Sequence, residues 1–411
     1  MRQIPFSPPD ISEAEIEEVV KTLRSGWITT GPRTKELERR LAEYCHTGKM
    51  VCLSSATAAE ELNLRVLGVG PGDEVIVPAY TYTATASAAI HCGASVVFVD
   101  SQKGGDTLTH APEMNYDAVE AAITERTKAV IPVDLGGIMC NYERLYQVVE
   151  GKKNLFRPAS AMQEALGRVA VVSDCAHALG ASRQGKMAGE ASDFASYSFH
   201  AVKNFTTAEG GGATWNIPGA DDDALYRLYQ LYSLHGQDKD ALAKSTQGAW
   251  EYDIVGPWYK CNMTDIMAAI GLSQLDRYPR LLKRRRELIA EYDAVCDGLG
   301  IFHLNHYGAG YSSSGHLYLT RIPGIGEKER NEIIAKLAAS GIPANVHYKP
   351  LPMMTAYQAY GWDIRDFPNA YDYYHNLITL PLHTKLSDED AAYVTGTYAH
   401  IVEEYRKGCF W

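Results

Sequence analysis

The sequence predicts an α/β protein with two domains, a large one built on a mostly parallel central sheet and a smaller C-terminal α+β one. Five short apolar runs, which read VCL, EVIVP, SVVFVD, KAVIPVD and VAVVSD, alternate with longer helical stretches from residue 51 onward. Continuously apolar strands separated by helices are typical of parallel sheets that are covered on both faces. The length of 411 residues suffices for two cores. We place the domains at residues 1–262, with an N-terminal arm, and 263–411.

A helix is predicted over residues 10–25, ahead of the sheet. Ser12 and Glu15 have the spacing of a capping box, and Gly26 supplies a stop. Apolar residues recur on one side of this helix, which we interpret as its packing face: Ile16, Val19, Val20 and Leu23.

The first two apolar runs end in residues that suit a flat, phosphorylated ligand. The first run leads into the small residues 54–57 and then a helix, and free amides at a helix N-terminus bind phosphate. Small residues also cap helices for structural reasons alone. The second run ends in PAYTYTAT, where Tyr80 and Tyr82 either stack on a ring or fill the core.

The fifth run delivers Asp174 from a strand too apolar to be exposed. A carboxylate in that position needs a partner, and a protonated ring nitrogen is a suitable one. Capping of a following helix is the alternative interpretation. Ligands of parallel sheets collect beyond the carboxyl ends of the strands, so we expect these residues to gather there.

Lys203 lies in SFHAVKNFTTAEGGG, residues 198–212. A lysine amine attacks a carbonyl only when it is unprotonated, a form that burial beside Phe199, Val202 and Phe205 would favour. A surface lysine beside a turn is the other interpretation. A lysine for an aldehyde, an acid for a pyridine nitrogen, an aromatic ring and a helix N-terminus for a phosphate are together what pyridoxal 5'-phosphate requires. The sequence therefore predicts this cofactor.

The segment after residue 262 predicts the small domain. A long helix through KRRRELIAEYDAV, a strand at HLYLTRI, a helix at EKERNEIIAKLAASG and a strand at PANVHYKP form an α+β arrangement. His316 and Tyr318 lie two apart on a predicted strand, so they should face the same side, either as a site wall or as packing.

Composition excludes several classes of function. The net charge of -11 argues against a nucleic-acid-binding protein. The eight cysteines form no CxxC pair and no cluster at metal spacing, so we expect reduced thiols and no bound metal. The sequence has no apolar signal core near residue 1 and no run of eighteen apolar residues. We expect a cytoplasmic protein without membrane contact.

The motifs of this chain, in order, resemble the DegT/DnrJ/EryC1/StrS family of pyridoxal-phosphate-dependent nucleotide-sugar aminotransferases over nearly the whole length. They read TGP at residues 30–32, SSATAAEEL, GPGDEVIVPAYTYTAT, GASVVFVD, ITERTKAVIPVD, SDCAHALGA, SFHAVKNFTTAEGGG, NMTDIMAAIGLSQL, and HLYL followed by VHYKPLP. The resemblance implies the fold-type-I aminotransferase architecture. SDxxHALG, SFHAxK and VHYKP especially resemble UDP-4-keto-sugar 4-aminotransferases of the pseudaminic acid pathway.

The resemblance implies a role for each candidate residue. Lys203 binds the cofactor aldehyde, Asp174 pairs with the pyridine nitrogen and Tyr82 stacks on the ring. The implied phosphate contacts are Ala56, Thr57 and Ser198, and His177 lies near the phenolic oxygen. The implied substrate neighbours are His347, Tyr348 and Lys349, although a purely structural strand end is the alternative. Sugar 3-dehydrases of this family have histidine in place of the lysine, so Lys203 favours transamination.

Three departures from the family pattern affect these expectations. The family's GyNyRM segment, whose Asn reaches the phosphate of the neighbouring subunit, reads WYKCNM here, so Lys260 or Asn262 takes that role. Asp134 stands where the family has the histidine of PVHLyG. Residues 144–168 are longer than a simple helix-to-strand connection and predict a surface insertion. A homodimer with shared active sites is implied.

We therefore expect an enzyme that transfers an amino group from an amino acid to a nucleotide-linked ketosugar for cell-surface glycan synthesis. The resemblance implies L-glutamate as donor and a UDP-4-keto-6-deoxy-hexosamine as acceptor. A lyase or dehydrase that uses the same cofactor is one alternative, because the fold does not choose the reaction. A non-enzymatic cofactor-binding sensor is the other, and the lack of a DNA-binding domain in the sequence argues against it.

Overall fold

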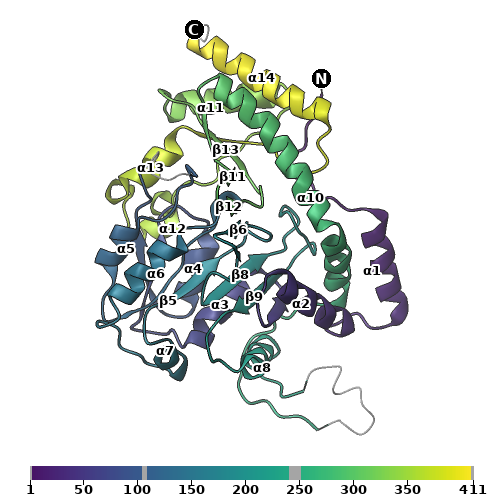
Figure 1. The fold of residues 1–411 in the computed structure, drawn as a ribbon, viewed down its shortest axis with the longest axis vertical. Coiled ribbons are helices and arrows are strands. Elements are labelled where there is room, and N and C mark those ends of the chain that lie inside the picture. The colour runs from purple at the N-terminus through teal and green to yellow at the C-terminus, as the bar shows by residue number, and fades with distance from the viewer. Residues whose placement is uncertain (1, 104–108, 240–250, 409–411) are drawn as a thin grey trace.

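The computed structural model describes residues 2–103, 109–239 and 251–408. Figure 1 shows a large domain in which helices surround a central sheet, a smaller domain above it, and the long helix α10, Asp265–Gly298, that runs between them. In the described part of the chain, no helix combines the length and apolar character that a membrane span requires.

The central sheet has seven strands in the order β1-β9-β8-β5-β4-β2-β3. The five strands expected from the apolar runs are β1 Met50–Leu53, β2 Glu74–Pro78, β3 Ser95–Val99, β4 Thr127–Val130 and β5 Ala170–Asp174. All neighbours from β8 to β3 are parallel, and β9 is antiparallel to both of its neighbours. The predicted mostly parallel sheet is confirmed. The strands β8, Phe194–Ser198, and β9, Gly211–Trp215, were not predicted, because small, polar and glycine residues interrupt their apolar character.

Helices cover both faces of this sheet. Side chains alternate across a strand, so Val75 and Val77 enter one core cluster and Ile76 enters the other. The first cluster includes residues of α3, α4 and α8, and the second includes residues of α2, α5, α6 and the first half of α10. The large-domain helices are α1 Glu13–Ser25, α2 Pro32–Tyr44, α3 Ala56–Leu67, α4 Thr83–His91, α5 Tyr116–Ala122, η1 Leu135–Gly137, α6 Tyr142–Gly151, α7 Ala161–Leu166 and α8 Asp222–Ser233.

The small domain has its own core around a three-stranded antiparallel sheet in the order β10-β13-β14. Its elements are β10 Phe302–His303, β13 Tyr318–Arg321, α11 Glu327–Ala339, β14 Leu377–Leu380 and α14 Asp388–Arg406. In α10, Leu281 still belongs to a large-domain cluster and Leu288 to the small-domain core. The cores therefore change within this helix, beyond the expected boundary at 262/263.

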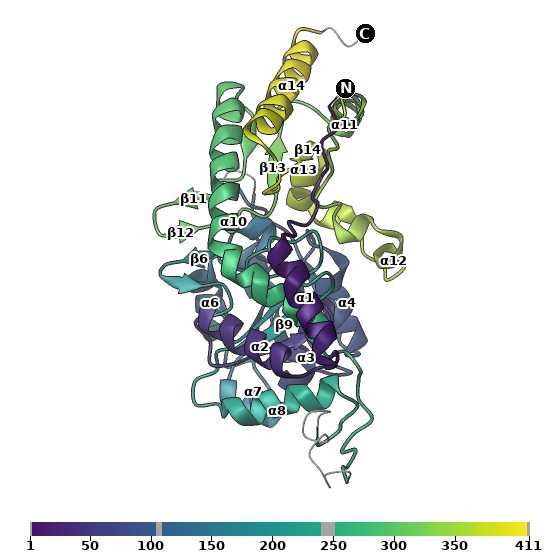
Figure 2. The ribbon, with the colours of Figure 1, turned by 90° about the vertical axis from the view of Figure 1, so that its right-hand side faces the viewer.

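Several shorter elements join the two domains. A four-stranded sheet combines β6 Ser182–Arg183 and β7 Lys186–Met187 with β11 Tyr307–Gly308 and β12 Tyr311–Ser312. Chain segments after the small-domain helix α11 return to pack on the large-domain core through α12 Thr355–Gln358 and α13 Pro368–His375. The 3-10 turns η2 Leu351–Met353 and η3 Ile364–Asp366 connect them. Figure 2 shows the N-terminal segment running along the small domain before α1, and Ile4 N–H donates to Gly341 O at 2.9 Å.

The prediction for the first helix is confirmed at its C-terminal end, begins three residues too early, since α1 spans Glu13–Ser25, and is wrong in its packing face. The capping box of Ser12 and Glu15 is present and Gly26 adopts the left-handed conformation. Ile16 and Leu23, however, are 47% and 53% exposed. The buried face instead carries Glu15, whose carboxylate accepts from the Arg277 guanidinium on α10 at 2.9 Å. A charge-assisted bond satisfies the buried carboxylate, so a polar face packs inward and an apolar one faces out.

The predicted strand at PANVHYKP is also wrong. Residues 343–350 form a single bridge, Asn345 to Thr379, and no continuous strand. The chain then leaves the sheet edge, because the amides of His347 and Tyr348 donate to side-chain oxygens and not to the backbone of a neighbouring strand. His347 N–H donates to Thr379 Oγ1 at 3.3 Å and Tyr348 N–H to Tyr80 Oη at 2.8 Å.

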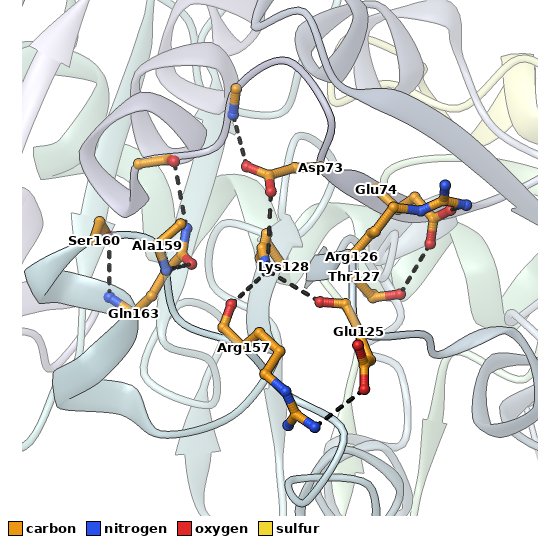
Figure 3. A network of polar contacts seen from close by, with 12 residues as sticks. Asp73, Glu74, Glu125, Arg126, Thr127, Lys128, Arg157, Ala159, Ser160 and Gln163 are labelled. Carbon is orange, nitrogen blue, oxygen red and sulfur yellow. Dashed lines mark hydrogen bonds and ion pairs between the residues drawn. The ribbon is translucent and has the colours of Figure 1, made fainter.

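The segment 144–168 contains most of α6 and all of α7, and it is anchored to the large domain (Figure 3). Lys128, which is buried, donates from Nζ to Glu125 O at 3.1 Å and to Arg157 O at 2.5 Å. Ser160 Oγ donates to Leu67 O at 2.7 Å. The long connection is therefore fastened to the end of the sheet opposite the carboxyl ends of the strands.

Replacing Lys128 with alanine is expected to destabilise the protein by about 1–3 kcal/mol, because two carbonyl groups lose a buried charged donor. Thermal unfolding of the variant measures this loss. Lys153→Ala is the matched control, since that side chain is 65% exposed and its change should stay within about 0.5 kcal/mol. Equal midpoints for both variants would show that the anchor contributes nothing.

Candidate active site

A pocket of about 460 Å³ lies beyond the carboxyl ends of the central strands. Its lining residues follow strands β1, β2, β4, β5 and β8 in turn: Ser55, Thr81, Val133, Ala176 and Lys203. This is the expected place for a ligand of a parallel sheet. The pocket brings together these candidates from the sequence: Ala56, Thr57, Tyr82, Asp174, His177, Ser198, Lys203, His347 and Tyr348.

Asp174 is the last residue of β5 and lies almost wholly out of solvent. Thr85 Oγ1 donates to its Oδ2 at 2.8 Å, and Ala176 N–H donates to its Oδ1 at 3.1 Å. Burial raises the pKa of this carboxyl, while the two hydrogen bonds and Lys203 oppose the rise. Turns and no helix follow Asp174, so the alternative of a helix cap is wrong.

Lys203 sits in the loop after β8, in the same pocket as Asp174. Burial lowers the pKa of its amine to about 8, and the Asp174 carboxylate partly opposes this shift. About one amine in ten is then unprotonated at neutral pH, which a nucleophilic lysine requires. The interpretation as a surface lysine beside a turn does not hold.

The N-terminus of α3 also lines the pocket. Ser55 caps the helix by accepting from Ala58 N–H at 3.1 Å, and Ala56 and Thr57 follow it in the first turn. A Cβ atom on Gly211 of β9 would lie 2.3 Å from Ser55 C and 2.4 Å from Ala56 N. Only glycine therefore lets the sheet approach this helix end so closely, and the amides there suit a phosphate.

Aromatic and imidazole groups line the open side. Tyr82 is 58% exposed and its ring lies 5.7 Å from that of Tyr348. Gly136 N–H donates to His177 Nδ1 at 3.2 Å, so the ring proton sits on Nε2, which lies 3.2 Å from Tyr348 Oη. Burial, and then Lys203, lower the pKa of His177 well below its ordinary value, so this imidazole is neutral.

The two candidates from the HLYL segment lie in different parts of the structure. The His316 ring lies 4.3 Å from the His177 ring, and its Nδ1 is 3.0 Å from Asn204 Oδ1, so it supports the site from behind. Tyr318 lies in the small-domain core and donates to Asp293 Oδ1 at 2.8 Å. The expectation that both face the same side is wrong, because β13 begins only at Tyr318 and strand alternation does not extend to His316.

His347 lines the pocket, whereas Lys349 is exposed and does not. Burial, and then Lys203, lower the pKa of His347 to about 4. The ring of Phe6 stacks on His347 at 5.7 Å, and Ser7 Oγ donates to Val202 O at 3.2 Å. The N-terminal arm thus reaches the site, which the sequence did not indicate.

Lys260 and Asn262 do not line the pocket of their own chain. Lys260 Nζ donates to Asn262 Oδ1, and Asn262 Nδ2 donates to Thr30 Oγ1. Burial lowers the pKa of Lys260. These two side chains pair with each other near the TGP segment and do not contribute to the pocket of their own chain.

Asp134, the departure from the family's histidine, is fully buried behind Asp174. Its carboxylate accepts from Cys140 N–H at 2.8 Å and Tyr142 Oη at 3.0 Å, and burial raises its pKa to about 7. Its own N–H donates to Asp174 O at 3.0 Å. Asp134 therefore holds the backbone of Asp174 in place.

The residues of this pocket fit pyridoxal 5'-phosphate. A buried carboxylate for a cationic nitrogen, a lysine with a lowered pKa for an aldehyde, a helix N-terminus for a phosphate and an exposed aromatic ring occur within one cavity. Sequence reasoning missed Thr85 and Glu60 among the lining and supporting groups. Their only signal was their place in helices that follow strands β2 and β1.

Comparison with known proteins agrees with this geometry. The model of the DegT/DnrJ/EryC1/StrS aminotransferase family matches residues 9–398. The spore coat polysaccharide biosynthesis protein SpsC of Bacillus subtilis is 35% identical over 410 residues, which cover 97% of each chain. The Streptococcus pneumoniae protein Spr1654, assigned as a sugar aminotransferase, has a TM-score of 0.94 in its PMP form, with 58% identity over 98% of this chain and 100% of that one.

Two further solved structures bear on the cofactor and the family. The PLP form of Spr1654 has a TM-score of 0.93 and 57% identity over 98% of this chain and 99% of that one. Helicobacter pylori PseC, an aminotransferase involved in pseudaminic acid biosynthesis, has a TM-score of 0.84 and 26% identity over 98% and 100%. The chain therefore belongs to the DegT/DnrJ/EryC1/StrS aminotransferase family and is a pyridoxal-phosphate-dependent aminotransferase.

Proposed function

We propose that this sugar aminotransferase transfers the amino group of L-glutamate to a nucleotide-linked 4-ketosugar, and that its product enters cell-surface glycan synthesis in the cytoplasm. The observation that carries the proposal is the placement of Lys203 and Asp174 in one pocket whose mouth is open beside Tyr82. An open mouth suits a substrate that carries a bulky nucleotide. The relatives named for spore coat polysaccharide and pseudaminic acid biosynthesis support the substrate class.

The chain's own groups divide the work of the reaction. Lys203 would hold the cofactor aldehyde, and its amine, with a pKa of about 8, would move a proton at the reacting carbon. Asp174, with its two hydrogen-bond donors, holds the charge opposite the cofactor nitrogen. The Nε2–H of His177 and the hydroxyl of Tyr348 are placed to orient oxygen atoms. When bound, the cofactor supplies the electron sink that stabilises a carbanion.

The charge balance of the pocket supports a site completed by a second copy of the chain. Among the described residues that line it, Lys203 is the one lysine or arginine, whereas Glu60, Asp174 and Glu209 are acidic. The cofactor phosphate, the donor carboxylates and a nucleotide diphosphate are all anionic. We infer that Lys260 and Asn262 of a partner subunit contribute to the phosphate end, and that the enzyme is a homodimer. The exposed apolar face of α1 and the exposed Val202 are compatible surfaces for contact.

The substrate proposal is tested with half-reactions. The pyridoxal form of the enzyme is mixed with L-glutamate, and its absorbance spectrum should convert to that of the pyridoxamine form. The isolated pyridoxamine form is then offered UDP- and dTDP-linked 4-ketosugars, and only the true acceptor should restore the first spectrum. Restoration by none of these, together with restoration by 2-oxoglutarate alone, would contradict the proposed acceptor class.

Mixing Lys203→Ala with the double variant Lys260→Ala/Asn262→Ala should restore activity if sites are shared. In a mixed dimer, one site keeps Lys203 and receives intact Lys260 and Asn262, while the other site loses all three. Equal amounts with free exchange should give about a quarter of the wild-type rate, because half of the dimers are mixed and half of their sites are intact. Each parent alone is the control. Confirmed subunit exchange without returning activity would contradict a shared site.

A further inference from the structure

Glu60 is a buried acid that lines the cofactor pocket. It lies on α3, four residues after Ala56, and is 2% exposed. Its Oε1 atom has no hydrogen-bond partner among the described residues, although the residue belongs to the pocket lining. Buried polar atoms are nearly always satisfied in a folded protein, so an unpartnered oxygen at a ligand cavity points to the ligand as its partner.

The position of Glu60 is fixed by helix α3, on which it lies, and by strand β8, to which it is hydrogen-bonded. Side chains on an α-helix lean toward its N-terminus, so Glu60 lies under the turn that begins with Ala56 and Thr57. Its Oε2 accepts a hydrogen bond from Ser196 Oγ on β8. Ser196 and Ser198 lie two apart on that strand and face the same side. Glu60 thus lines the same pocket as the amides and hydroxyl proposed to bind the phosphate, and Ser196 holds it from outside the pocket lining.

The groups around Glu60 keep it uncharged. Asp174 on β5 is the other acid that faces it, and burial together with Asp174 raises the pKa of the Glu60 carboxyl well above its usual range. Lys203 also lines this pocket, and the acid that acts on the pKa of its amine is Asp174. Because the Ser196 hydroxyl donates to Oε2, the proton of the neutral acid lies on Oε1, where it can be donated.

We propose that Glu60 is a further cofactor-binding residue, a neutral acid whose Oε1–H donates a hydrogen bond to the bound cofactor and leaves Asp174 as the one buried carboxylate that lines the pocket. The inference rests on the proposed assignment of this pocket to the cofactor. A neutral Glu60 makes the affinity for the ligand depend on pH. A phosphorylated ligand disfavours an additional negative charge, so affinity is full below the pKa of Glu60 in the free protein. Affinity then falls by up to about tenfold per pH unit above that pKa.

The test uses pyridoxine 5'-phosphate, which lacks the aldehyde and cannot bond covalently to Lys203. Its Kd is measured by calorimetry on cofactor-free wild type, Glu60→Gln and Glu60→Leu between about pH 6 and about pH 9. The ratio of wild-type to variant Kd cancels the titrations of the phosphate and of Lys203, which all three proteins share. Thermal unfolding of each cofactor-free protein checks that the variants fold.

The glutamine variant, which can donate a hydrogen bond and cannot ionise, should match wild type within about threefold near pH 6 and bind more tightly than wild type above the pKa of Glu60. The leucine variant should bind about tenfold more weakly than the glutamine variant at every pH, because it offers no donor. Glu61→Gln, on the same helix and outside the pocket lining, is the control and should leave the profile unchanged.

Parallel pH profiles for wild type and Glu60→Gln would overturn the proposal, as would equal affinities of the glutamine and leucine variants. These failures are distinguishable from failure of the pocket assignment. If borohydride reduction of the loaded enzyme labels a lysine other than Lys203, the assignment itself is wrong. If the label lies on Lys203 and the profiles are parallel, only the role of Glu60 is wrong.

Discussion

Replacing Lys203 with alanine is expected to lower kcat by about 10⁴-fold or more, because the amine serves both as nucleophile and as acid–base group. The wild-type protein should be yellow and lose this colour on borohydride reduction, with the label on the peptide that contains Lys203. The variant can still bind the cofactor through the α3 N-terminus and Asp174, since neither depends on the lysine. Turnover is measured by following amino-acid consumption at saturating ketosugar.

The control for this loss is Lys153→Ala, because Lys153 is exposed on the opposite part of the large domain and should leave kcat unchanged. Addition of a small primary amine to the Lys203→Ala variant should recover part of the proton transfer. Normal turnover by Lys203→Ala would contradict the assignment of Lys203 as the catalytic lysine. Loss of colour with the label on another lysine would place the cofactor elsewhere.

The sequence predicted the site best where local pattern and tertiary role coincide. Asp174 and the amides at Ala56 follow strands whose apolar character is plain, so both the strand and its carboxyl end could be located. Lys203 could be placed near them because its neighbours Phe199 and Phe205 are large and apolar, and both are buried. These features depend on short stretches of chain, which a sequence displays directly.

The errors arise where burial depends on distant segments. Glu60 was not singled out, because a charged residue on a helix is usually exposed, yet its carboxylate is buried and bonds to Ser196 of β8. On α1 the salt bridge from Glu15 to Arg277 turns the apolar residues outward. Tyr318 was expected to face the same side as His316 because the start of β13 is not visible in the sequence. For Glu60 and Glu15, a partner more than a hundred residues away decides which face is buried.

Replacing Asp174 with asparagine should lower kcat by about 10²-fold to 10⁴-fold, because the amide keeps the shape and removes the charge opposite the cofactor nitrogen. The bonds from Thr85 and Ala176 can still be accepted by the amide oxygen or rearranged around it. Burial raises the pKa of Asp174, which means that the charged form is held at a cost in the folded protein. The cofactor-free variant should therefore unfold at the same temperature as wild type or slightly above it.

Two matched variants make the Asp174 result specific to charge at the cofactor. Asp174→Glu keeps the charge but moves the carboxylate by one methylene, so it should be nearly as slow as the asparagine variant. Asp134→Asn changes a neighbouring buried acid that does not line the pocket, and kcat should stay within about tenfold of wild type. Stopped-flow absorbance of the half-reaction with L-glutamate measures all three rates, and calorimetry measures their unfolding. A half-reaction in Asp174→Asn as fast as in wild type would show that this carboxylate shapes the loop after β5 and does not tune the cofactor.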